Sequence, residues 1–355
     1  MNYAEKERAT LGFTPYEGSG SVEETFYPWN LTAERFVEEG ISRELTDRAL
    51  YYKDPADSSL DEQKKMYFVV NGSRGVMEYE HSLGFDPVLR IGFNLPFCRT
   101  VPEVLGETEG TLTRRNVLGK IVCRDKSSGL EREIHNPVES QEDWEALKEY
   151  GKRQLELLYT DEILEEVYGP FVNAHEAGDY SLRLNIEGFF WVPRELLGIE
   201  EHLFVFYDEP ELIHDMCQSI LEIYTTKLLK VIDMLKPDVL YISEDLSGAN
   251  GPMISPAFFD EFIASYYKQL IPLLKQHGVG LVFVDTDGDF NALIHYMKLC
   301  CLRAKADKRT SHHRETFFCK TLVGTKGLEP LQYHYWQILS LLRLPIPPRP
   351  HALSS

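Results

Sequence analysis

Acidic residues follow three apolar runs in the second half of the chain. They are Glu187 after SLRLNI, Glu244 and Asp245 after DVLYIS, and Asp285, Asp287 and Asp289 after GLVFV. Carboxylates gathered at one place can act as general acids and bases or can bind a metal ion. A single acid after a strand more often caps the next helix or lies in solvent. It is therefore the recurrence at three run ends that favours a functional site.

The last of these clusters, VDTDGDF, permits several kinds of site. A calcium loop of the EF-hand type needs glycine at its sixth position and glutamate at its twelfth, whereas Gly288 is fourth from Asp285 and Tyr296 is twelfth. The segment LVFVDTDG resembles the D-x-D-G-T phosphatase motif of haloacid dehalogenases. However, Asp289 replaces the threonine, and the chain after it offers no acidic pair of the kind those enzymes need. A polar turn is the third alternative.

The three runs belong to alternating strand and helix patterns, which predict a parallel sheet covered by helices. Strands are expected at 181–190, 238–245 and 279–285, and long helices at 208–235 and 255–278. Ser255 followed by Pro256 is typical of a helix start. Because the carboxyl ends of parallel strands lie at one edge of a sheet, the acids should meet there.

The first half of the chain is organised differently. Residues 1–65 carry helical patterns, and residues 66–136 alternate β-forming residues with turn signals such as KSSG, which predicts a small antiparallel meander. Ser140 before Asp143 indicates a capping box at the start of a helix. We expect 1–150 to be an extension of the same α/β domain and 151–297 to hold its strand–helix units.

Composition restricts the partners and the compartment. The formal net charge of the 355 residues is −19, which disfavours nucleic acid and anionic membranes as partners. No apolar run approaches the roughly 20 residues that cross a bilayer, and the start lacks the features of a signal peptide. Six cysteines without a C-x-x-C pair favour reduced thiols and a cytoplasmic location.

Residues 298–355 differ from the rest of the chain. They hold ten Lys or Arg against three acids, together with three of the six cysteines and four of the eleven histidines. RLPIPPRPHALSS is too rich in proline for a helix or an internal strand, and KLCCLRAKADKRTSHHRETFFCK shows no strand pattern. We expect this basic segment not to complete the sheet, as if the chain diverged near residue 298 through a frameshift or an assembly join.

Three ordered blocks of the sequence resemble the uroporphyrinogen decarboxylase superfamily. They are GFFWVPRELLGIEEHLFVFYDEPELIHDM, then GPMISPAFFDEFIASYYKQLIPLLKQHG with its G-P-x-x-S-P-x-x-F-x-x-F pattern, and VFVDTDGDFNALI with D-x-D-G-[ND]. The resemblance covers about residues 5–297. It is closest to an uncharacterised group related to methylcobamide:coenzyme M methyltransferases. It implies a (β/α)8 TIM-type barrel with an N-terminal extension, here incomplete at its C-terminus.

The activity that the resemblance implies first is corrinoid-linked methyl transfer. The alternatives are a uroporphyrinogen decarboxylase, which needs no cofactor, and an inactive truncated or corrinoid-binding protein. True decarboxylases carry an early M-R-Q-A-G-R stretch that this chain lacks, and zinc methyltransferases carry His and Cys at the positions of Asp285 and Asp287. An aspartate pair is a hard-oxygen site that matches a thiolate-binding zinc poorly.

The resemblance also implies partners and individual roles. The implied cofactor is a corrinoid (methylcobamide) or a divalent metal, and the implied partners are a small-molecule tetrapyrrole, a methyl donor or acceptor, or a corrinoid protein. We expect catalytic or metal-binding roles for Asp285, Asp287, Glu244 and Asp245, and substrate-binding roles for Arg194, Trp191, Glu187, Asn250 and Asp289. Arg194 could instead form a surface ion pair, and the backbone near Asn250 could hold an anion or form a plain loop.

Overall fold

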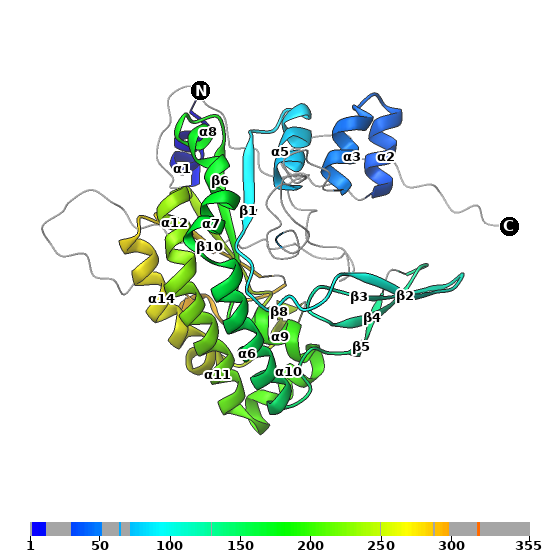
Figure 1. The fold of residues 1–355 in the computed structure, drawn as a ribbon, viewed down its shortest axis with the longest axis vertical. Coiled ribbons are helices and arrows are strands. Elements are labelled where there is room, and N and C mark those ends of the chain that lie inside the picture. Colours follow the sequence, from blue (N-terminus) through cyan, green and yellow to red (C-terminus); the bar gives the residue numbers. More distant parts are fainter. Residues whose placement is uncertain are drawn as a thin grey trace, which may run out of the picture.

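The structure is a computed structural model that describes residues 2–11, 30–51, 64, 72–128, 130–248, 250–286, 288–297 and 318–319. These residues form an α/β fold, in which a parallel sheet is covered by helices (Figure 1). Among them, no helix is both long and apolar enough to cross a membrane.

The strands of the parallel sheet follow the order of the chain. They are β1 (Val88–Gly92), β6 (Ser181–Glu187), β7 (Val239–Ser243), β10 (Val282–Asp285) and β11 (Phe318–Cys319), hydrogen-bonded in that order. Every neighbouring pair is parallel. Strands that add successively in one direction place their crossover helices on one face, as in a barrel and unlike a doubly wound sheet. The predicted parallel sheet is confirmed, whereas closure into an eight-stranded barrel stays a prediction.

Two strands differ from the sequence prediction. β1 falls within 66–136, the segment predicted to form only an antiparallel meander. The meander itself consists of β2 (Glu103–Glu107), β3 (Thr111–Arg115), β4 (Ile121–Asp125) and β5 (Glu131–His135). β11 lies in 298–355, where no strand is predicted, and pairs with β10; the rest of that segment lies outside the described residues. Short strands give weak local signals, because pairing with a neighbour selects them more than propensity does.

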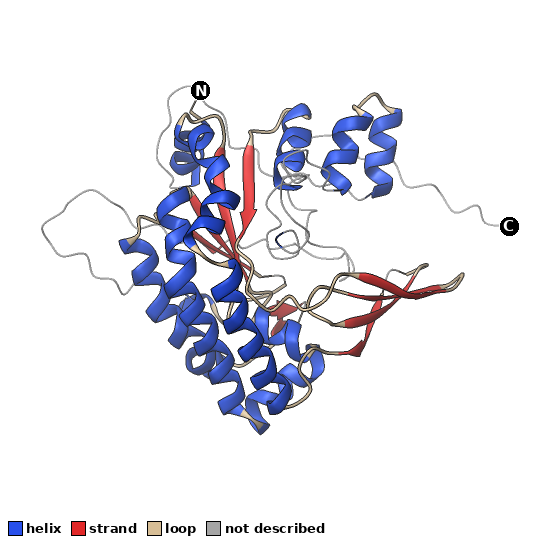
Figure 2. Cartoon of the chain, in the orientation of Figure 1, coloured by secondary structure: helices blue, strands red, loops and turns tan. Residues whose placement is uncertain are grey.

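The helices between residues 141 and 276 gather on one side of the parallel sheet, whereas the helices between residues 30 and 82 lie beyond β1, and the meander extends away from the covering helices (Figure 1 and Figure 2). In chain order the helices and helical turns are α1 (Tyr3–Leu11), α2 (Asn30–Glu38), α3 (Arg43–Tyr51), α5 (Gly72–Ser82), α6 (Gln141–Leu158), α7 (Asp161–Tyr168), η2 (Gly169–Phe171), α8 (Val172–Glu176), α9 (Trp191–Leu197), α10 (Ile199–Asp208), α11 (Pro210–Ile223), η3 (Tyr224–Leu228), α12 (Leu229–Leu235), α13 (Pro256–Phe258), η4 (Phe259–Ala264) and α14 (Ser265–Gln276). The helices predicted at 208–235 and 255–278 correspond to continuous helices from Pro210 to Leu235 and from Pro256 to Gln276, each of which contains a π-helical turn, η3 or η4.

The predicted helix starts are confirmed. The Ser140 hydroxyl accepts a hydrogen bond from the Asp143 amide at 3.2 Å and donates to the Asp143 carboxylate at 2.8 Å. Ser255 accepts from the Phe258 amide at 3.2 Å, with Pro256 at the first helical position. These contacts satisfy amide groups that have no partner within the helix.

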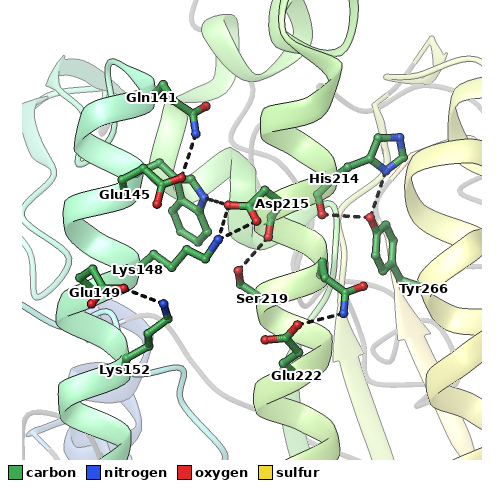
Figure 3. Close-up of polar contacts among 12 residues, drawn as sticks. Gln141, Glu145, Lys148, Glu149, Lys152, His214, Asp215, Ser219, Glu222 and Tyr266 are labelled. Carbon is green, nitrogen blue, oxygen red and sulfur yellow. Dashed lines mark hydrogen bonds and ion pairs between the residues drawn. The ribbon is translucent and has the colours of Figure 1, made fainter.

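Helix α6 is held against α11 by a buried aromatic residue and one carboxylate (Figure 3). The indole N–H of Trp144, a fully buried side chain, donates to Asp215 Oδ2 at 2.6 Å. The Lys148 ammonium lies 2.6 Å from Asp215 Oδ1. Hydrogen bonds to an ionised group are stronger than neutral ones, so this contact fixes the two helices relative to each other.

The amino ends of the strands are closed by α1 and by ion pairs. Asp238, just before β7, accepts hydrogen bonds from the Leu182 amide at 2.9 Å and from His175 at 2.8 Å, and it also pairs with Arg8 of α1. Glu7 of α1 pairs with the buried Arg183 of β6. These charged residues at the amino ends of the strands are therefore paired with one another and stabilise the fold. A functional site is expected at the opposite end of the sheet, where the strands have their carboxyl ends.

Candidate functional site

The ends of three parallel strands lie level at one edge of the sheet. Ser243, the last residue of β7, has two register partners. Glu187 at the end of β6 is its partner on one side, and Asp285 at the end of β10 is its partner on the other. Glu244 is the next residue after Ser243. Since adjacent strands lie about 4.8 Å apart, the backbones that carry these acids are close neighbours. The structure therefore places the backbones of Glu187, Glu244 and Asp285, one acid from each of the three runs, at the same edge.

Glu244 points into the protein and is fully buried. Its Oε2 accepts hydrogen bonds from the amides of Phe190 at 2.8 Å and Trp191 at 3.0 Å, and its Oε1 accepts one from the Tyr267 hydroxyl. Burial raises the pKa of Glu244 to about 7, although the hydrogen bonds from Tyr267 and the backbone amides act in the opposite direction. Both carboxyl oxygens therefore have donors inside the protein.

Glu187 lies beside Glu244 but in a different environment. Its side chain is half-buried, and no hydrogen-bond donor to its carboxyl lies among the described residues. Burial raises the pKa of Glu187 to about 7, and the negative charge of Glu195 acts in the same direction. Burial raises the pKa of the Cys98 thiol to about 12, and the negative charge of Glu187 acts in the same direction. Glu187 is therefore a candidate for proton exchange near neutral pH at this edge.

Two tyrosines that sequence reasoning missed surround these acids. Tyr224, in the π-helical turn η3, donates from its hydroxyl to the Glu187 carbonyl. Burial, and then the charges of Glu187 and Glu244, raise the pKa of Tyr224 well above its ordinary value. Tyr267, which bonds Glu244, follows the second π-helical turn, η4. Turns of this kind often occur at functional sites, but neither helix carries a sequence signal that would have identified these hydroxyls.

Arg194 and Asp245 form a partly buried ion pair. Arg194 Nη1 lies 2.6 Å from Asp245 Oδ2, with side chains 12% and 18% exposed. The guanidinium carbon of Arg194 also lies 5.2 Å from the centre of the Trp191 ring, which is a cation–π distance. Arg194 is thus ion-paired, but with a residue of the predicted site and not on an open surface. Asp245, with φ of +49°, is held by this partner.

The loops that follow β7 and β10 are joined by backbone hydrogen bonds. The Asp285 carbonyl accepts from the amides of Glu244 and Asp245, both at 3.1 Å. The Thr286 hydroxyl accepts from the Leu246 amide at 2.8 Å. The threonine of the D-T-D-G-D stretch therefore has a structural contact, and the two loops form one rigid edge.

Gly288 and Asp289 complete the same contact. Gly288 has φ of +67°, and a Cβ atom there would lie 2.1 Å from the Gly248 carbonyl oxygen, so no other residue fits without a shift. The Asp289 amide donates to that carbonyl at 3.0 Å. The Asp289 carboxylate accepts from the Asn291 amide at 3.0 Å and from its side chain at 2.7 Å, which is a turn contact. The polar-turn alternative accounts for this part of the motif.

Three predicted site residues remain: Asp285, Asn250 and Asp287. Asp285 is half-buried at the end of β10. Asn250 is exposed in the turn of a short hairpin formed by β8 (Ser247–Gly248) and β9 (Gly251–Pro252). Asp287 lies outside the described residues, so its catalytic or metal-binding role stays a prediction.

A metal site is not assembled by the described part of the chain. Among those residues, no group of three or more His, Cys, Asp or Glu side chains is placed to hold a metal ion. Asp285 is one oxygen donor, and hard divalent ions take several. The described residues therefore do not fit a bound zinc or magnesium ion.

Comparisons with known proteins add a limited structural likeness. No model of a protein family matches the sequence, and no curated protein matches it. Among solved structures, a methyltransferase from Methanosarcina mazei matches with a TM-score of 0.45 and 14% sequence identity, over 83% of this chain and 73% of that chain. The likeness is one of structure, and it assigns neither an activity nor a site to this chain.

Proposed function

We propose that the protein is an enzyme of corrinoid or tetrapyrrole metabolism that transfers a methyl group at the carboxyl ends of its parallel strands. Two findings support this proposal. The ordered sequence blocks resemble the uroporphyrinogen decarboxylase superfamily and its methyltransferase-related group, and the acids of three strand ends share one edge of the sheet. The single observation that carries the proposal is the place of Glu187: a half-buried acid at the end of β6, level with the ends of β7 and β10, where burial raises its pKa to about 7.

In methyl transfer, the proposed role of Glu187 is that of general base. A thiol or similar acceptor must lose its proton before its sulfur can take a methyl group, and a carboxylate with pKa near 7 accepts a proton at neutral pH. A bound methylated corrinoid would supply the methyl group. Arg194 and the Trp191 ring would hold an anionic part of the substrate, and Asp285 and Asp287 would complete the acidic edge.

Decarboxylation of a tetrapyrrole carboxylate is the second candidate, favoured by the same pKa. When a carboxylate leaves as carbon dioxide, a proton must replace it on the carbon. At pH 7, a carboxyl group with a pKa of about 7 is protonated in about half of the molecules, so Glu187 could donate that proton as a general acid. This reaction needs no cofactor. A corrinoid-binding protein without catalysis is the third outcome that an experiment must separate.

The test is to incubate the purified protein with methylcobalamin and a thiol or folate acceptor and to follow the absorption spectrum of the corrinoid. Methyl transfer predicts loss of the methylcobalamin spectrum, and Glu187→Gln should slow it about 100-fold, because general base catalysis contributes ~10²–10⁴-fold. Glu222→Gln is the matched control, since Glu222 is exposed on α11 and its carboxylate accepts a hydrogen bond from the Gln218 side chain at 3.1 Å.

Two outcomes separate the candidate functions, and a third tests the role of Glu187. Uroporphyrinogen that loses carboxyl groups, detected by mass spectrometry, without any methyl transfer would favour the decarboxylase. Binding of methylcobalamin without turnover would favour the non-catalytic protein. Equal rates for the wild type and Glu187→Gln would contradict the role of Glu187.

A further inference from the structure

We propose that Glu244 is a positioning residue: its buried carboxyl fixes the segment from Glu187 to Trp191 and thereby places the reactive Glu187 and the Trp191–Arg194 pair. What Glu187 does there rests on the proposed function, whereas the positioning itself does not. Although Glu244 follows its strand as the other acids do, it is fully buried, and a substrate at the open edge could not touch it.

The hydrogen bonds of Glu244 join three separate elements. Glu244 follows β7, its Oε2 holds the amides of Phe190 and Trp191 at the start of α9, and its Oε1 accepts from Tyr267 on α14. The held amides lie three and four residues after Glu187 along the chain. A shift of the carboxyl would therefore move the start of α9, which carries Trp191 and Arg194.

Gly188 explains why the carboxyl can reach this position. The Gly188 amide donates to the Ser243 carbonyl at 2.7 Å, so the chain stays against β7 directly after Glu187. A Cβ atom on Gly188 would lie 2.0 Å from the Glu244 carboxyl carbon. Glycine therefore provides the space that the Glu244 carboxyl fills, and the two residues fit only as a pair.

The same geometry shows that a neutral side chain can replace Glu244. In Glu244→Gln, the amide oxygen can accept from the two backbone amides and the NH2 group can donate to the Tyr267 oxygen. Glu244→Ala offers no acceptor to the Phe190 and Trp191 amides, which stay buried without partners. A positioning role thus predicts rescue by glutamine, whereas a catalytic acid or base would be lost in both variants.

The experiment compares Glu244→Gln, Glu244→Ala and Tyr267→Phe in the full chain. Protein labelled with 5-fluorotryptophan is observed by ¹⁹F NMR, and the Trp191 resonance is assigned with Trp191→Phe. We expect Glu244→Gln to keep the wild-type Trp191 resonance, more than half of kcat and the wild-type pH profile. Glu244→Ala should shift or broaden that resonance and lower kcat about 100-fold, because displacement of a reacting group by ~1 Å can cost that much. Tyr267→Phe, which keeps the two amide contacts, should give a smaller shift.

Several results would overturn the inference. Loss of activity in Glu244→Gln with an unchanged Trp191 resonance would show that Glu244 acts in the chemistry. An unchanged resonance in Glu244→Ala would show that Glu244 positions nothing. If Glu244→Ala does not fold, a Trp191 resonance that shifts in Glu244→Gln, which keeps an acceptor for both amides, contradicts the inference in its place. If neither the wild type nor any variant turns over substrate, the proposed function fails. The ¹⁹F resonances still decide whether Glu244 has the positioning role.

Discussion

Replacing Glu244 by glutamine should raise the unfolding free energy relative to the wild type at neutral pH. This gain should be much smaller at pH 5. Burial raises the pKa of Glu244 from 4.5 to about 7. Between these values the folded protein holds a proton that the unfolded chain has released. The contribution of Glu244 to the free energy of unfolding of the wild type therefore falls as pH rises from 4.5 to about 7 and is level above that. Glutamine does not titrate, so Glu244→Gln lacks this contribution to the pH dependence of the unfolding free energy.

The size of the effect follows from the shift. A rise from 4.5 to about 7 corresponds to about 3 kcal/mol at ~1.36 kcal/mol per pKa unit, and Glu244 is fully buried, so solvent does not screen it. Over pH 5 to 8 the difference in unfolding free energy between Glu244→Gln and the wild type should grow by about 2–3 kcal/mol. Glu187, whose pKa is also about 7, is present in both proteins and cancels.

The assay is urea unfolding followed by circular dichroism at pH 5, 6, 7 and 8. Glu222→Gln, on the exposed face of α11, is the matched control and should run parallel to the wild type throughout. A difference between Glu244→Gln and the wild type that stays constant or shrinks as pH rises would refute the reasoning, because it would mean that Glu244 is not held neutral by burial.

Two further predictions concern the scaffold of the site. Asp215→Ala should lower the unfolding free energy by about 1–3 kcal/mol, because the buried indole N–H of Trp144 loses its acceptor and Lys148 loses its partner. The control is the exposed ion pair between Glu149 and Lys152 on α6, the helix that carries Trp144 and Lys148. Glu149→Gln should not change the urea midpoint (Figure 3). Burial acts to raise the pKa of Asp215, but the hydrogen bonds and charge of Lys148 together with the hydrogen bond from Trp144 outweigh it and lower the pKa below 3.8. The Asp215 effect should therefore persist above pH 4 and disappear as pH falls through the lowered pKa. Gly288→Ala should lower the thermal midpoint, because its φ of +67° and its contact with a carbonyl oxygen both exclude a Cβ, and an unchanged midpoint would contradict the loop contact.

The parallel sheet and its acidic edge could be predicted because their signals are local. Apolar runs, the helix-capping residues Ser140 and Ser255, and the acids that follow the runs are all visible within a few neighbouring residues. Parallel pairing then aligns the strand ends without further information. β1 was missed because a five-residue strand is defined by its partner β6 and not by its own pattern.

The separate roles of the acids could not be predicted. Glu187 and Glu244 both follow apolar strands, but only Glu244 turns inward, because Gly188 leaves room for it and Tyr267 reaches it from a distant helix. Pairing of Arg194 with Asp245 likewise joins residues 51 positions apart. Contacts of this kind depend on the folded arrangement, which no local spacing encodes.

The central claim is that Glu187 is the accessible acid–base group at the strand ends. The most direct measurement is a ¹³C NMR titration of protein labelled at the glutamate carboxyl carbon, from pH 5 to 9, for the wild type, Glu187→Gln and Glu244→Gln. The wild type should show two carboxyl resonances with midpoints near 7, of which each variant lacks one. If Glu187→Gln removes no resonance that titrates near pH 7, Glu187 is not a general base or acid at neutral pH, and the proposed chemistry at this edge is wrong.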